Sequence, residues 1–112
     1  MFVRIATSAA LAVAMSTTAV ARDYISIAGS STVLPFATIV AERLGRNYNQ
    51  KTPVVESGGS SVGKKGVCVG IGTEFIDIGN ASSRMKTAEL EYCDKNGVKL
   101  TEIKVGYDGI VV

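Results

Sequence analysis

The chain has 112 residues, and its 12 Lys and Arg against 10 Asp and Glu give a formal net charge of only +2. This balance, with no basic stripe carrying interleaved aromatic residues, argues against nucleic acid as a partner. The sequence contains no His. The commonest general base and a usual zinc ligand are therefore missing, so Ser-His-Asp catalysis and most metal-dependent hydrolysis are unsupported.

The N-terminal residues have the pattern of a secretory signal. Arg4 precedes an uncharged apolar run from Ile5 to Met15, and Ala19-Val20-Ala21 is a small-x-small cleavage site. The apolar run is shorter than the roughly 20 residues that a membrane-spanning helix requires. The sequence therefore predicts a signal peptide at residues 1–21 and an exported mature chain at residues 22–112.

Short strands alternate with helices in the mature part. Strands are predicted where β-branched and aromatic residues cluster, at residues 24–27, 54–55, 75–78 and 100–105. The first of these strands is expected to break at Gly29. A turn over residues 106–109 should lead into a further strand that begins at Ile110.

Helices are predicted between these strands. Residues 34–48 carry Pro35 in the first turn, and the buried face is expected to consist of Phe36, Ile39, Val40 and Leu44. A short helix over residues 66–71 should carry Cys68 inward, and a helix over residues 87–96 should stop at Asn96-Gly97. The alternation of strands and helices indicates an α/β sheet.

Three loops rich in Gly and hydroxyl residues follow the first three strands, at residues 30–32, 57–61 and 80–84. In a parallel sheet such loops meet outside the carboxyl ends of the strands. Backbone N–H groups at helix starts and neighbouring hydroxyls suit an oxyanion, and Arg84 offers one cationic contact. We therefore expect a site for a small tetrahedral oxyanion. The alternative for the first loop is that its Ser and Thr only cap the following helix.

Other interpretations of the second loop are open. Gly58–Lys64 matches the G-x-x-x-x-G-K of a nucleotide-binding P-loop, although Lys65 stands where the magnesium-binding Ser or Thr belongs. An acyl-transfer Ser at position 31 or 60 would lack both a His and a G-x-S-x-G elbow. A flexible Gly/Ser linker is also possible, but the apolar residues 67–69 follow directly.

Cys68 and Cys93 are the two cysteines of the chain. In an exported protein, a single pair is more typical of a disulfide than of a metal site or a redox couple. The bridge would close a loop of about 25 residues and stabilise the fold by ~3 kcal/mol in the chain-entropy model.

Five segments together resemble, in this order, the N-terminal part of the periplasmic phosphate-binding proteins of ABC-type phosphate transporters. They are AGSSTVLPF, VESGGSSVGKKGVC, IDIGNASSRMK, EYCDKNGV and EIKVGYDGIVV. The resemblance implies an α/β chain that forms a partial first lobe of a two-lobed periplasmic-binding-protein fold, truncated at residue 112. It also implies high-affinity binding of inorganic phosphate in the periplasm for delivery to a membrane permease. No enzymatic activity, cofactor or metal is implied, and the full-length protein is expected to be a monomer.

The resemblance also assigns residues to the phosphate site. Ser31 and Thr32 match the first phosphate-contacting loop, and Ser60 matches the second. In the third loop some members have an Asp where Ser82 stands, and others read Ala-Ser-Arg, whereas here Ser83 intervenes before Arg84. The expected phosphate contacts are Ser31, Thr32, Ser60, Ser82 and Arg84. Two alternatives are a binding protein for another oxyanion such as sulfate, and a secreted α/β structural or adhesive module without a ligand.

Overall fold

The computed structural model describes residues 21–111. The predicted signal peptide, residues 1–21, therefore lies outside the described residues except for its last position, and it stays a prediction. Within the described range, no helix has both the length and the apolar character that crossing a membrane requires.

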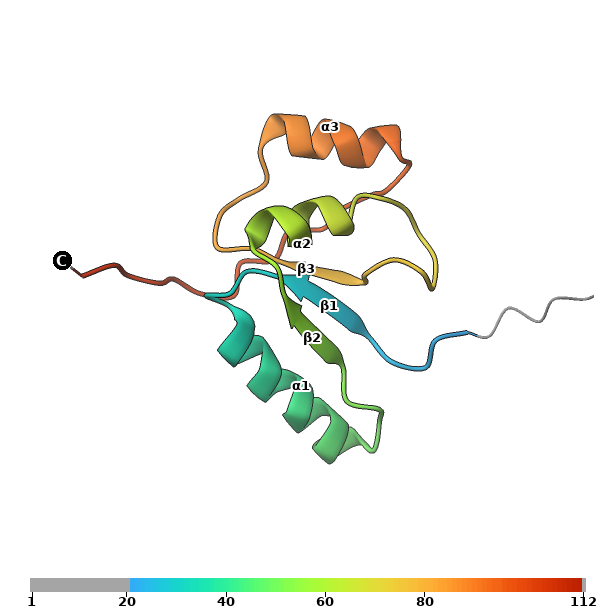
Figure 1. The fold of residues 1–112 in the computed structure, drawn as a ribbon, viewed down its shortest axis with the longest axis vertical. Coiled ribbons are helices and arrows are strands. Elements are labelled where there is room, and N and C mark those ends of the chain that lie inside the picture. The colour runs from blue at the N-terminus through green and yellow to red at the C-terminus, as the bar shows by residue number, and fades with distance from the viewer. Residues whose placement is uncertain (1–20, 112) are drawn as a thin grey trace, which may run out of the picture.

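Three parallel strands form the centre of the fold described by residues 21–111. They are β1 (Ser26–Gly29), β2 (Val54–Ser57) and β3 (Ile78–Asn80), and their order in the sheet is β2-β1-β3 (Figure 1). Gly29 is in register with Ser57 on one side and with Asn80 on the other. The three strands therefore end at the same level of the sheet, and the predicted α/β class is confirmed.

Helices cover the two sides of this sheet in the described part of the chain. They are α1 (Leu34–Tyr48), α2 (Ser60–Gly66) and α3 (Thr87–Lys95). Figure 1 shows α1 beside β2 on one side, and α2 packed on β1 and β3 on the other side with α3 stacked beyond it. Pro35 lies in the first turn of α1, where a missing N–H costs no helical hydrogen bond.

The buried face of α1 differs from the prediction. Ala41 is buried, whereas Phe36, Ile39 and Val40 are 68%, 50% and 66% exposed. The apolar stripe of this helix is wide, so spacing alone does not decide which part of the stripe meets the sheet. The side with small residues makes the contact, because a small residue such as Ala41 allows a close approach.

The second helix lies earlier than predicted. The sequence predicts a helix at residues 66–71, but α2 occupies Ser60–Gly66 and Cys68 lies in the turn that follows it. A Cβ at Gly63 would lie 2.5 Å from the Asn80 carbonyl oxygen and 2.8 Å from that of Ala28. This close packing on the sheet offsets the low helix propensity of glycine, so the flexible-linker interpretation is wrong.

The strand boundaries also need correction. β1 and β3 each begin later than predicted, at Ser26 and Ile78. Phe75 belongs to a turn instead, and its N–H donates to the Gly72 carbonyl oxygen at 3.2 Å. Parallel pairing with β1 therefore starts only after this turn.

No strand or turn forms over the described residues 99–111, so the predicted strands at 100–105 and from Ile110, and the turn at 106–109, are wrong. The Glu102 carboxylate accepts hydrogen bonds from Arg84 Nε and from the Met85 N–H, both at 3.1 Å. Side-chain contacts, and not a ladder of backbone hydrogen bonds, thus hold the start of this segment.

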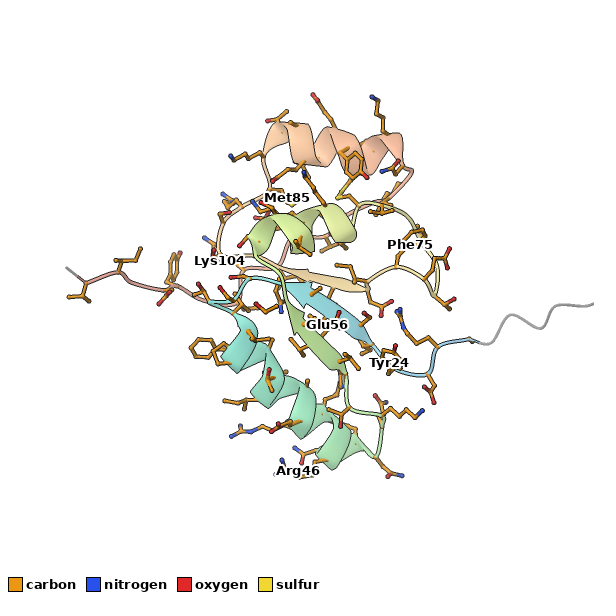
Figure 2. The ribbon with its side chains drawn as sticks, in the orientation of Figure 1. Tyr24, Arg46, Glu56, Phe75, Met85 and Lys104 are labelled. Carbon is orange, nitrogen blue, oxygen red and sulfur yellow. A yellow bond between two sulfur atoms is a disulfide. The ribbon has the colours of Figure 1, made fainter. Side chains whose placement is uncertain are left out.

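A disulfide joins α3 to the turn after α2. Cys68 and Cys93 form the predicted bridge and are buried together with Val98. Val67, Leu100 and Met85, the last labelled in Figure 2, pack around them. The predicted stop of α3 is also confirmed, because Gly97 has a φ of 69° and the Val98 N–H returns to the Cys93 carbonyl at 2.9 Å.

Candidate functional site

The three hydroxyl-rich loops are held together at the carboxyl ends of the strands. The carbonyl oxygen of Gly29 accepts hydrogen bonds from the N–H groups of Gly58 and Gly59, at 2.9 and 2.8 Å. On the other side of β1, the Ser30 N–H donates to the Asn80 carbonyl oxygen at 3.0 Å. Backbone bonds around the end of β1 therefore connect all three loops into one edge.

Ser60 and Ser82 meet at this edge. Their Oγ atoms are 3.0 Å apart, and the Ser82 N–H donates to Ser60 Oγ at 2.9 Å. Ser60 is the first residue of α2 and is half-buried, whereas Ser82 is exposed in the loop after β3. The structure thus brings together two of the sequence-predicted site residues from different loops, and both hydroxyls lie near the surface.

Ser31 and Thr32 lie in the turn between β1 and α1, with exposed side chains. The turn is closed by the Leu34 N–H, which donates to the Ser30 carbonyl oxygen at 3.1 Å. The N-cap residue of α1 is Val33, and no side chain among residues 21–111 caps this helix. The interpretation that Ser and Thr of this loop serve only as helix caps is therefore wrong.

Arg84 forms an ion pair at the surface. Its side chain is 83% exposed, and its Nε lies 3.1 Å from Glu102 Oε1. The Met85 N–H and then Arg84 lower the pKa of Glu102 below its ordinary value, so the carboxylate stays charged. An anion that binds Arg84 would compete with this carboxylate.

Lys64 is a buried lysine that the sequence singled out only as part of the P-loop pattern. Its Nζ donates to Ser83 Oγ at 2.9 Å and to the Arg84 carbonyl oxygen at 2.7 Å. It also pairs with a Glu89 carboxylate oxygen at 3.3 Å. In a P-loop the lysine reaches the nucleotide phosphates, whereas this ammonium group is directed at protein acceptors.

The hollow at the opposite end of the sheet is lined by charged residues that pair with one another. This open cavity of about 640 Å³ is bounded by residues that include Arg22, Asp23, Lys51 and Asp77. Arg22 pairs with Asp77, and Lys51 Nζ lies 2.5 Å from Asp23 Oδ2. Because these ion pairs satisfy the charges within the chain, we place the candidate site at the other end, with the serine pair.

Residues 14–112 match a PBP superfamily domain, so the chain belongs to the PBP superfamily. This is the class that the motifs of the sequence indicated. Among curated proteins, Protein SphX of Synechococcus elongatus (strain ATCC 33912 / PCC 7942 / FACHB-805) is 35% identical over 91 residues. The match covers 81% of this chain and 26% of SphX, so the chain spans about a quarter of that relative's length. No solved structure matches the chain.

Proposed function

We propose that the chain supplies the first-lobe part of a site for inorganic phosphate in an exported solute-binding protein. The observation that carries this proposal is the Ser60–Ser82 pair, held where three donor-rich loops meet. Membership of the PBP superfamily and the motif resemblance to phosphate-binding proteins support it. In the two-lobed protein the site binds phosphate with high affinity and delivers it to the permease of an ABC-type importer.

Hydroxyl groups suit this task because each can turn its proton toward an anion. Two Oγ atoms 3.0 Å apart can both donate to a single phosphate in place of their mutual contact. Hydrogen bonds to an ionised acceptor are shorter and stronger than bonds between neutral groups, which favours this exchange. Ser31 and Thr32 contribute from the first loop, and Arg84 contributes its charge by moving away from Glu102.

The affinity of this chain alone should be modest. Ser82, Ser31 and Thr32 are exposed, so water competes for the same donors. Charge-assisted hydrogen bonds contribute far less in water than in a closed cleft. We therefore expect millimolar binding by the isolated chain, and tight binding only when a second lobe excludes the water.

Amide NMR spectra recorded during a phosphate titration test the proposal. At constant ionic strength, amide signals of residues 58–61 and 81–84 should shift with a millimolar midpoint. Ser60→Ala and Ser82→Ala should each weaken the response, while Ser61→Ala, an exposed neighbour on α2, should titrate like the parent. Absence of saturable shifts at these loops would contradict the phosphate site.

A parallel sulfate titration addresses the second candidate ligand. Sulfate is a candidate because Ser82 stands where some of the phosphate-binding proteins that this sequence resembles have an Asp. An Asp carboxylate would repel a fully ionised anion such as sulfate, and Ser82 does not. Stronger binding of sulfate than of phosphate would replace phosphate by sulfate in the proposal. If neither anion shifts the amide signals, a structural or adhesive module is favoured.

A further inference from the structure

Two contacts connect α2 to the loop after β3, one helical turn apart. Ser60 and Lys64 are four residues apart on α2 and so lie on the same face of that helix. Ser60 contacts Ser82, and Lys64 contacts Ser83 and the Arg84 carbonyl oxygen. The helix therefore holds consecutive residues of the third loop at consecutive points.

The lysine contact should be the more rigid of the two. Lys64 is only 5% exposed, and an ammonium group has three protons to satisfy. Described residues supply the acceptors: the Ser83 hydroxyl, the Arg84 carbonyl and the Glu89 carboxylate. A displaced loop would leave a buried charge short of partners, which is costly, so the loop is kept in one position.

Glu89 connects the Lys64 contacts to the third helix. One of its carboxylate oxygens accepts the Lys86 N–H at 2.7 Å at the start of α3 and also faces Lys64 at 3.3 Å. The Lys64 ammonium group therefore joins α2, the third loop and α3.

We propose that Lys64 is a positioning residue that fixes the third loop so that Ser82 meets Ser60. Its ammonium group bonds the loop from behind and does not bind the anion. This inference rests on the proposed function, in which Ser60 and Ser82 bind phosphate. This role explains the Lys of the G-x-x-x-x-G-K pattern without a nucleotide.

Hydrogen exchange at the Ser82 amide tests the positioning without any ligand. This N–H donates to Ser60 Oγ, so it should exchange faster when the loop is released. Lys64→Met should accelerate the exchange, while Lys65→Met, which removes the same charge from an exposed neighbour on α2, should not. Ser83→Ala removes only the hydroxyl that Lys64 bonds and should act in the same direction, which covers the case that Lys64→Met fails to fold.

Phosphate titration of the same variants supplies the second readout. Lys64→Met should weaken binding by about tenfold, the lower end of the effect seen when an outer-shell partner that orients a metal ligand is removed. Equal weakening by Lys65→Met would assign the effect to net charge and overturn the proposal. Unchanged Ser82 exchange in both Lys64→Met and Ser83→Ala would also overturn it. If the parent chain binds no phosphate while Ser82 exchange changes as expected in the variants, the proposed function is refuted but the positioning role of Lys64 is supported.

Discussion

Gly63 is a point of close approach between α2 and the sheet. Backbone oxygens of Asn80 and Ala28 would lie 2.5 and 2.8 Å from a Cβ at this position, and Gly29 Cα would lie at 2.9 Å. These neighbours are main-chain atoms, so none of them can rotate away as the end of a side chain could. The position of Ser60 and Lys64 over the third loop therefore depends on the absence of a side chain at residue 63.

Gly63→Ala should destabilise the protein by about 3 kcal/mol, because the helix must lift from the sheet to relieve the overlap. The measurement is urea unfolding followed by circular dichroism. Gly66→Ala on the same helix is the control, since its Cβ would meet Ile76 Cδ1 at 2.8 Å, and that side chain can move. Similar losses in the two variants would contradict the assignment of Gly63 as the contact point.

Two carboxylates should make the stability sensitive to acid. The Lys86 N–H and then Lys64 lower the pKa of Glu89, and the Met85 N–H and then Arg84 lower the pKa of Glu102. In the unfolded chain both groups regain their ordinary pKa and bind protons more readily. Their contribution is therefore fully present above the ordinary value of 4.5 and is lost as the pH falls through the lowered folded-state values.

The free energy of unfolding should accordingly decrease as the pH falls below about 4.5. Urea unfolding of the parent and of Glu89→Gln at a series of acidic pH values measures this dependence. The variant should be less stable than the parent near neutral pH and should show a shallower pH dependence. Parallel profiles for the two proteins would mean that Glu89 does not contribute to the acid sensitivity.

Among the elements, those with strong local signals could be predicted from the sequence. Pro35 and the apolar spacing located α1, and the Asn96-Gly97 pair located the end of α3. α2 could not be located, because three glycines in residues 58–63 disfavour a helix locally, and no local pattern shows that Gly63 lies in close contact with the sheet. The alternating residues 100–105 suggested a strand, yet a strand requires a partner as well as a pattern.

Part of the candidate site could also be predicted from the sequence, and part could not. The three loops could be recognised because parallel strands bring the residues after their carboxyl ends to one edge. The contact between Ser60 and Ser82 follows from that arrangement. The role of Lys64 could not be found, because its acceptors lie in the third loop and in α3 and no local pattern links them to α2.

The disulfide is the covalent link between the second and third helical segments. Cys68 follows α2 and Cys93 belongs to α3, 25 positions further along the sequence. The oxidised chain should contain no titratable thiols when denatured without reductant. The double variant Cys68→Ala/Cys93→Ala should be less stable by about 3 kcal/mol in denaturant unfolding. Two reactive thiols per unreduced chain, or a double variant as stable as the parent, would contradict this.

On the scale of the whole molecule, the core of the described residues is small. Its buried apolar residues are Ile27, Ala28, Ala41, Cys68, Cys93 and Val98. Hydrophobic stabilisation grows with the apolar area removed from water, and small side chains remove little of it. Large apolar side chains lie at the surface instead, on α1 and along the segment after α3.

The full chain should therefore unfold at a low temperature or over a broad range, even with the disulfide intact. The small core gives a small enthalpy of unfolding, and a small enthalpy widens the thermal transition. Exposed apolar residues such as Phe36, Val40 and Ile103 should also promote association as the concentration rises. Scanning calorimetry with light scattering at several protein concentrations measures both effects. A sharp, concentration-independent transition above ~65 °C would show that the fold is more stable than its core implies.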